Sequence, residues 1–305
     1  MRKIALAVLV LLFSTLCARA DGFLFNNGSF TALQDPHFPS MTPSSINNKG
    51  TIVGGSFAGA FIDENGVITA LNVPTPTGIN DFGEIVGYGI PFLPGIGSQS
   101  FIDINGHIQT LIAPGADMDG AHGFTEAFGV NNSGEVVGTF QNGPQLPDGG
   151  ANLQGFLYRN GAFTILNAPA ATLGTLAVGI NNLGQVVGDY PVQLASGSRE
   201  LEGFLYSAGI YRTFSLPCTG AEVSGINDLG EIVGSCVGSQ GFILSPGSAT
   251  FLRFPDSVTT SANAINDFGE IVGAYTVPEP GTVLLIAIGL IGLCATRRIL
   301  TSVGG

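Results

Sequence analysis

The sequence predicts an all-β chain folded as a six-bladed β-propeller, and three observations support that prediction. A motif of the form Ile-Asn-Asp-x-Gly-Glu-Ile-Val-Gly occurs in six copies along the chain. A second motif, of the form Gly-Phe-Leu-Tyr, alternates with the first. The repeat region begins with a copy of the second motif and ends with a copy of the first. Repeats spaced about 40 residues apart are typical of solenoids, propellers and arrays.

The first motif predicts a β-hairpin, here called the first hairpin. Asn and Asp bond their own backbone in turns, and Gly adopts positive φ without steric cost. The paired β-branched residues after the turn, such as Ile85 and Val86, point to opposite faces of a strand. Both faces of that strand are therefore expected to be buried. The six copies begin at Ile46, Ile79, Val130, Ile180, Ile226 and Ile265.

The second motif predicts another hairpin, here called the second hairpin. Its strand turns through an Asn-Gly pair such as Asn65-Gly66, or through a lone Gly, into a further strand such as Ala162–Leu166. One first hairpin and one second hairpin together make a unit of four strands. The six copies of the second motif contain Phe23, Phe61, Phe101, Phe156, Phe204 and Phe242.

The two ends of the repeat region distinguish a closed ring from an open solenoid. Residues 22–33 form a second hairpin alone, and residues 265–275 form a first hairpin alone. An open solenoid would expose both half-units as sheet edges, whereas a ring pairs them. We therefore expect a propeller over residues 21–276 whose closing blade takes two strands from each terminus.

The composition agrees with blades that pack face to face. Charged residues make up 10% of the chain and Gly contributes 46 of 305 residues, against about 25% charge in an ordinary soluble domain. The net charge of −12 argues against nucleic acid as a partner, because nucleic-acid binding requires basic patches.

The alternation of the two motifs resembles a bacterial extracellular repeat called HAF. The pattern is clear at residues 79–87 for the first motif and 155–158 for the second. The resemblance covers nearly all of residues 21–275. It implies a secreted, propeller-like domain and no particular activity.

The N-terminus predicts a secretory signal peptide over residues 1–20. A short basic segment, Met1-Arg2-Lys3, precedes an apolar run at 4–16 and the small-x-small site Ala18-Arg19-Ala20. Cleavage is expected before Asp21. The alternative is an uncleaved membrane anchor.

The C-terminus predicts a sorting segment over residues 277–305. The sequence Val277-Pro278-Glu279-Pro280 precedes an apolar run at 282–295 and then Arg297-Arg298. This order resembles the PEP-CTERM sorting signal. The resemblance implies recognition and cleavage by exosortase, a membrane enzyme, and delivery to the outer surface or exopolysaccharide matrix of a Gram-negative bacterium. The tail after Arg298 departs from the pattern, since it is longer and less basic.

Physical chemistry favours a transient anchor for this segment. The two prolines favour an extended, accessible chain. The apolar run is shorter than the ~20 residues that span a bilayer, and the two arginines are expected to stay cytoplasmic. We therefore expect a transmembrane sorting helix that holds the protein in the inner membrane only temporarily. The alternative is a permanent anchor.

Two of the four cysteines lie within the predicted propeller. Cys218 and Cys236 flank the fifth first hairpin near its open end, so they can approach each other across two strands. Export permits a disulfide, and strand register decides whether the geometry allows it. The alternative is two packed thiols.

No catalytic, metal-binding or cofactor-binding motif is recognisable in the sequence. The recurring Asn, Asp and Glu of the first hairpin can be interpreted as a ring of cation ligands. Asx-turns explain their spacing without a ligand, so we expect no metal and no cofactor.

Loop lengths suggest a ligand surface. In a four-stranded meander the connections alternate between the two faces of the disc, and the links between hairpins share one face. Three consecutive links are long, at 88–99, 139–154 and 189–202, and the link at 114–126 lies on the same face. Long loops on a rigid scaffold commonly carry binding sites. The residues that we expect at this ligand rim are Tyr88, Phe92, Asp117, Asp119, His122 and Tyr190.

The sequence favours a non-enzymatic surface or matrix protein that binds exopolysaccharide or another surface protein. The alternative is an extracellular glycan hydrolase or lyase, which requires converging carboxylates such as Asp117, Asp119 or Glu126. A third hypothesis is a purely structural protein without a ligand.

Overall fold

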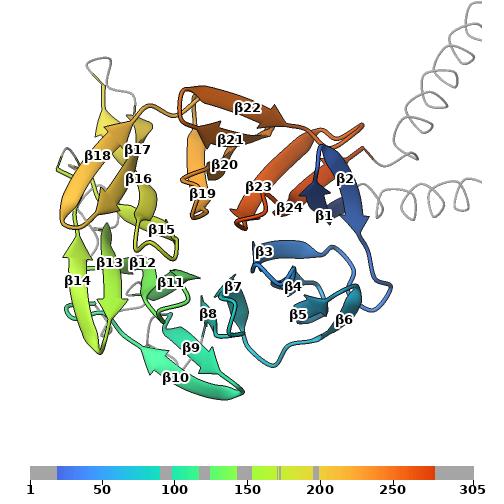
Figure 1. Cartoon of the computed structure of the whole chain (residues 1–305), viewed down its shortest axis with the longest axis horizontal. Helices are drawn as coiled ribbons and strands as arrows, with labels where there is room; N and C mark the ends of the chain where they lie inside the picture. Colours follow the sequence, from blue (N-terminus) through green and yellow to red (C-terminus); the bar gives the residue numbers. More distant parts are fainter. Residues whose placement is uncertain are drawn as a thin grey trace, which may run out of the picture.

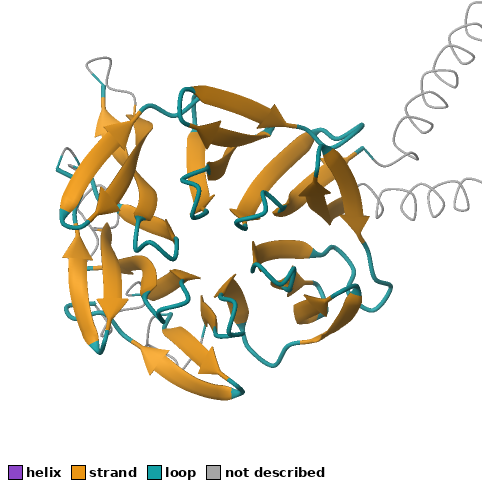
Figure 2. Cartoon of the chain, in the orientation of Figure 1, coloured by secondary structure: helices purple, strands orange, loops and turns teal. Residues whose placement is uncertain are grey.

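The computed structural model describes residues 19–89, 98–116, 124–142, 153–169, 171, 173–194 and 199–278. Within these ranges the regular structure is β throughout, in six sheets of four antiparallel strands each. The sheets are arranged radially around a central axis (Figures 1 and 2). The predicted six-bladed β-propeller is confirmed.

Blade 1 contains β3 (Thr42–Ile46), β4 (Ile52–Ser56), β5 (Gly59–Glu64) and β6 (Val67–Ala70). Blade 2 contains β7 (Thr75–Ile79), β8 (Ile85–Tyr88), β9 (Ser100–Ile104) and β10 (His107–Leu111). Blade 3 contains β11 (Thr125–Val130), β12 (Val136–Gln141), β13 (Leu153–Arg159) and β14 (Ala162–Leu166). Blade 4 contains β15 (Leu176–Ile180), β16 (Val186–Gln193), β17 (Arg199–Ser207) and β18 (Ile210–Phe214). Blade 5 contains β19 (Ala221–Ile226), β20 (Ile232–Cys236), β21 (Gly241–Ser245) and β22 (Ser248–Leu252).

Blade 6 closes the ring with two strands from each end of the repeat region. Its strand order is β2 (Ser29–Leu33), β1 (Arg19–Asn26), β24 (Ile271–Val277) and β23 (Thr259–Ile265). Phe25 pairs with Ile271 and Leu24 with Val272. Because β1 and β24 hydrogen-bond to each other along their length, the two terminal half-units form one continuous four-stranded sheet and neither strand is left as an unpaired edge.

The second strand of each blade is buried on both faces, as the paired β-branched residues predict. The second residue of the pair is a fully buried Val in every copy, at Val53, Val86, Val137, Val187, Val233 and Val272. The Gly that follows this Val pairs with the Phe of the second motif, as in Gly87 with Phe101. A Cβ on Gly87 would overlap the carbonyl oxygen of Thr75 and lie 2.8 Å from the Phe101 ring. The two motifs are therefore one packing unit, in which Gly makes room for Phe.

One link differs from the sequence prediction. We expected residues 189–202 to form a long loop, but β16 and β17 continue into it and pair from Asp189 with Gly203 to Gln193 with Arg199. Pro191 lies within this extension and does not interrupt it. The partner strand β15 ends at Leu176 opposite Asp189, so the missing N–H of Pro191 removes no bond to β15. The long link predicted at residues 139–154, in blade 3, is shortened in the same way, because β12 and β13 pair as far as Gln141 with Leu153.

Several sequence predictions lie outside the described residues. These are most of the signal peptide, the apolar sorting segment after Pro278, and the rim residues Phe92, Asp117, Asp119 and His122. In the part of the chain that the structure describes, no helix is long and apolar enough to cross a membrane.

Candidate functional site

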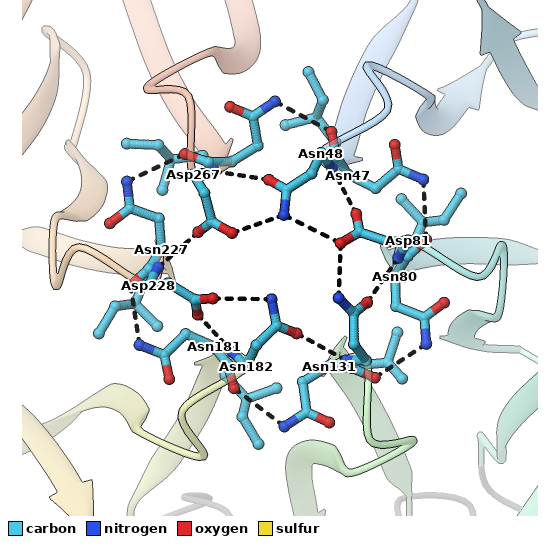
Figure 3. Close-up of a pocket in the computed structure, with 18 residues that line it drawn as sticks. Asn47, Asn48, Asn80, Asp81, Asn131, Asn181, Asn182, Asn227, Asp228 and Asp267 are labelled. Carbon is cyan, nitrogen blue, oxygen red and sulfur yellow. Dashed lines mark hydrogen bonds between the residues drawn. The ribbon is translucent and has the colours of Figure 1, made fainter.

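The turns of the six first hairpins converge on the propeller axis, at what we call the turn face of the disc. They surround a cavity of about 70 Å³ (Figure 3). Each blade contributes the same three positions to its wall: an Ile or Val, an Asn, and an Asn or Asp. Two closed cycles of hydrogen bonds link these positions from blade to blade.

The first Asn of each turn builds the outer cycle. Its Nδ2 donates to the backbone carbonyl of the equivalent Asn in the next blade, over distances between 2.9 and 3.1 Å. The cycle closes when Asn266 donates to Asn47. Its members are Asn47, Asn80, Asn131, Asn181, Asn227 and Asn266.

This position requires both a donor and an acceptor. In blade 2, Asn80 Oδ1 accepts the backbone N–H groups of Phe82 (3.0 Å) and Glu84 (2.9 Å), which forms the Asx-turn. Asn80 Nδ2 donates to Asn131 O (3.0 Å) and also to Glu84 Oε2 (2.6 Å). Asn80 is 2% exposed, so each of these bonds satisfies a group that water does not reach. Asp has no such donor, which explains why all six copies carry Asn here.

The Glu or Gln after the turn Gly has the same role in five blades. Its side chain accepts a bond from the first Asn of its own turn, over 2.6 to 2.9 Å. The Asx-turn interpretation was therefore correct for the bonds within each turn but incomplete. It missed the blade-to-blade bonds, although the signal was present: the first position is invariant among the repeats, whereas the second varies between Asn and Asp.

The second position builds the inner cycle. Its backbone N–H donates to the side-chain oxygen of the equivalent residue in the next blade, over 2.7 to 2.9 Å. Asn and Asp both offer that oxygen, so either fits. The members are Asn48, Asp81, Asn132, Asn182, Asp228 and Asp267. Three carboxylates therefore line the mouth of the channel (Figure 3).

An apolar constriction lies directly beneath the polar mouth. It consists of Ile46, Ile79, Val130, Ile180, Ile226 and Ile265, which also line a second axial cavity of about 90 Å³. A water molecule occupies about 30 Å³ in the liquid. Each cavity thus holds a few waters or one side-chain head group, and a larger ligand must lie over the mouth.

The described members of the predicted rim lie on the opposite side, here called the link face. Tyr88 ends β8, is partly buried, and has its ring centre 6.2 Å from that of Phe128. Tyr190 lies on the extended part of β16, where its ring is buried and its hydroxyl donates to Glu202 Oε2 at 2.8 Å. Burial and this contact raise the pKa of Tyr190 to about 12. Tyr190 therefore belongs to the core between blades 3 and 4 and offers little surface to a ligand.

Two carboxyl groups on the link face have altered acidity. Burial raises the pKa of Glu126. Burial also raises the pKa of Tyr88, and the negative charge of Glu126 raises it further. Burial also raises the pKa of Asp189 to about 7, opposed by the N–H of Val223, which donates to Asp189 Oδ2 at 3.0 Å. Asp189 therefore links blade 4 to blade 5. Across the described ranges, no group of three or more His, Cys, Asp or Glu side chains is arranged to hold a metal ion.

A disulfide joins the two cysteines of the propeller. Cys218 and Cys236 are bonded with their Cα atoms 6.0 Å apart. Cys218 precedes β19, and Cys236 ends the neighbouring strand β20. The bond therefore ties the entry of blade 5 to its second strand.

Comparison with known proteins identifies the C-terminal segment. Residues 276–298 match the family model described as the PEP-CTERM protein-sorting motif. The chain carries a PEP-CTERM sorting signal. This signal implies export, sorting by exosortase and transient membrane anchoring in Gram-negative bacteria. It begins at the end of β24, where Thr276 and Val277 still pair with β1. The resemblance to HAF repeats stays a prediction, with which the propeller fold is compatible.

Similarity to solved structures concerns the fold alone. The chain resembles a protein of unknown function from Dyadobacter fermentans DSM 18053, with 12% identity and a TM-score of 0.50, over 85% of this chain and 98% of that one. The similarity is lower to an acylaminoacyl peptidase in complex with Z-Gly-Gly-Phe-chloromethyl ketone (TM-score 0.44, 12% identity, 79% of this chain and 42% of that one). The same holds for YCF48 bound to D1 peptide (TM-score 0.36, 15% identity, 76% and 77%). A search of the curated proteins found no significant match.

Proposed function

We propose that this protein is an exported, non-enzymatic propeller that exosortase releases from the inner membrane to the cell surface or exopolysaccharide matrix. The observation that carries the proposal is the PEP-CTERM motif at residues 276–298, immediately after the closing strand of the propeller. In this proposal the signal peptide ends before Asp21 and the propeller over residues 21–276 is the delivered product.

The closed ring supports a role in binding or assembly. Its two axial hydrogen-bond cycles join all six blades, so the turn face is a rigid platform. We propose exopolysaccharide or another surface protein as the ligand. The link-face rim of Tyr88, Phe92, Asp117, Asp119, His122 and Tyr190 remains a proposal, in which the first five residues have the greater weight because Tyr190 is buried.

Cell fractionation of motif variants tests the proposal. Replacement of Pro278 and Glu279 by Ala in the full chain should leave the protein in the inner-membrane fraction, while the unaltered chain appears in the surface or matrix fraction. Replacement of the acidic surface residue Glu200, which is exposed on blade 4, by Ala is the matched control and should not change the distribution. Equal surface delivery of both variants would contradict exosortase-dependent sorting.

A glycan hydrolase or lyase is the second candidate, and one observation favours it. Glu126 and Asp189 lie on the link face of neighbouring blades, and burial raises the pKa of both. A carboxyl group with a raised pKa is suited to act as a general acid. Incubation with exopolysaccharide should then release reducing ends, and the variant Glu126→Gln should not. Absence of release by the unaltered protein counts against this candidate.

A further inference from the structure

The turn face has an apolar arc that borders one half of the axial mouth. The third residue of each first-hairpin turn follows the inner-cycle residue in the sequence and is exposed in all six blades. In blades 4, 5 and 6, which are consecutive around the axis, this residue is Leu183, Leu229 or Phe268, and these side chains are 65%, 68% and 73% exposed. Blade 2 has a fourth apolar residue at this position, Phe82, which is 70% exposed. It is separated from the arc by Lys49 of blade 1 on one side and Ser133 of blade 3 on the other. Exposed apolar residues that gather in one place commonly mark an interaction site.

The carboxylates of the mouth are concentrated on the same side. Asp228 and Asp267 are neighbours in the inner cycle, on blades 5 and 6. Elsewhere in the ring, amide side chains bridge the carboxylates: Asn48 Nδ2 donates to both Asp81 (3.1 Å) and Asp267 (2.7 Å). Among the hydrogen bonds of the described residues, the backbone N–H of Asp228 donates to Asp267 Oδ1, and no side chain bridges the two carboxylates (Figure 3).

These two carboxylates retain capacity to accept further bonds. Asp228 Oδ1 and Oδ2 accept the backbone and side-chain N–H groups of Asn182. Asp267 Oδ1 accepts the N–H of Asp228, and its Oδ2 accepts from Asn48. A carboxylate has about four acceptor sites, so a positively charged group over the mouth can bond to both residues.

We propose that this half of the turn face binds a basic segment of a partner protein. One Lys or Arg side chain would place its head group against Asp228 and Asp267, and its apolar neighbours would cover Leu183, Leu229 and Phe268. Charge complementarity selects this occupant, because the apolar arc borders two negatively charged carboxylates, Asp228 and Asp267, that no side chain bridges to each other. The size of the mouth agrees, since about 70 Å³ admits a head group but no sugar ring or folded domain.

The inference rests on the proposed binding role, but its test uses the purified, folded protein. Its failure would therefore leave export and sorting untouched. The probes are three fluorescein-labelled peptides of the sequence Gly-Leu-Phe-x-Leu-Phe-Gly with Arg, Gln or Glu at the central position. Fluorescence anisotropy at 50 mM and 500 mM NaCl measures their affinity.

The Arg peptide should bind about 10-fold more tightly than the Gln peptide at low salt, and the Glu peptide more weakly still. High salt should reduce the preference for Arg. The double variant Asp228→Asn and Asp267→Asn should abolish that preference. Asn is compatible with the ring, because Asn132 and Asn182 are already adjacent members. Thermal denaturation confirms that the variant is folded.

The apolar contribution has a matched control. Leu229→Ser together with Phe268→Ser should weaken the Arg and Gln peptides alike, by about 10-fold. Phe57→Ser removes an even more exposed ring, 86% exposed, from the link face and should have no effect. The proposal is overturned if no peptide binds, if Arg and Gln peptides bind equally, or if the Asp228 and Asp267 variant keeps the preference. It is also overturned if Ca²⁺ alone binds at this pair and excludes the Arg peptide, because the site would then be a cation site.

Discussion

Replacement of a single axial Asn by Asp tests the outer cycle directly. In Asn80→Asp the side chain keeps its shape and its bonds from Phe82 and Glu84, but it loses both N–H donors. The bond to Asn131 O at 3.0 Å and the bond to Glu84 Oε2 at 2.6 Å disappear. The new carboxylate also faces that of Glu84 across the site of the second bond.

The magnitude follows from these contacts. A neutral hydrogen bond contributes about 1 kcal/mol and one to a charged acceptor about 2 kcal/mol. Repulsion between two carboxylates near 4 Å adds about 1 to 4 kcal/mol, depending on solvent access. Together these contributions should lower the free energy of unfolding of Asn80→Asp by about 4 to 7 kcal/mol at pH 7.

Two other blades provide internal controls. Asn181 donates to Gln185 rather than to a Glu, and the Gln amide can rotate to donate to a new carboxylate. Asn47 is followed by Thr51 and donates only to Asn80 O among the described hydrogen bonds. Both Asn181→Asp and Asn47→Asp should therefore cost about 1 to 2 kcal/mol. The cost of burying the new charge adds to the loss in all three variants alike, so the differences between the variants carry the test.

Urea unfolding measures the three variants, with fluorescence and circular dichroism as independent probes of a two-state transition. Addition of Glu84→Gln to Asn80→Asp should recover at least about 2 kcal/mol, because the repulsion is gone and the Gln can donate. Equal losses in the three single variants, or no recovery in the double variant, would refute the proposed role of the Nδ2 donors.

Three further predictions concern other parts of the propeller. Burial raises the pKa of Asp189 to about 7, so its favourable contribution to stability is present below its unfolded pKa near 4 and is lost as the pH rises through about 7. Asp189→Asn should therefore stabilise the protein at pH 8 by up to about 4 kcal/mol. An unchanged pH dependence of urea unfolding in this variant would be evidence against this. Gly87→Ala should lower the free energy of unfolding by about 3 kcal/mol, because the new Cβ meets Thr75 O and the Phe101 ring. Gly55→Ala, whose Cβ has nothing within 4 Å, should change the free energy of urea unfolding by less than about 0.5 kcal/mol. We expect no free thiol from Cys218 or Cys236 when the purified propeller, residues 21–276, is denatured without reductant and titrated. Reduction of the disulfide should lower the free energy of unfolding by about 3 kcal/mol. Two titratable thiols before reduction would show that the bond is absent.

Most of the fold could be predicted from the sequence because the repeat encodes it locally. The Asn-Gly turns, the paired β-branched residues and the alternation of two motifs each specify one hairpin. Complementary half-units at the two ends then specify closure, and the pairing of Phe25 with Ile271 agrees. The extension of β16 past Asp189 was missed, because the spacing between the two motifs does not show how far the strands continue beyond them.

Less of the candidate site could be predicted. Sequence reveals the bonds that Asn80 makes within its own turn, but the carbonyl of Asn131 lies 51 residues away and becomes its neighbour only when the ring closes. In the same way, Leu229 and Phe268 look like ordinary turn residues until closure places them beside the same mouth. Tyr190 illustrates the opposite error: loop length suggested an exposed position, but the strand extension buries the ring.

The intact mass, without reductant, of the protein recovered from the cell surface tests export, processing and the disulfide together. We expect a chain that begins at Asp21, ends within or just before the Val277–Pro280 segment, and weighs two hydrogens less than the reduced form. A surface protein that retains Arg297 and Arg298, or a mature chain found only in the inner membrane, would contradict this expectation.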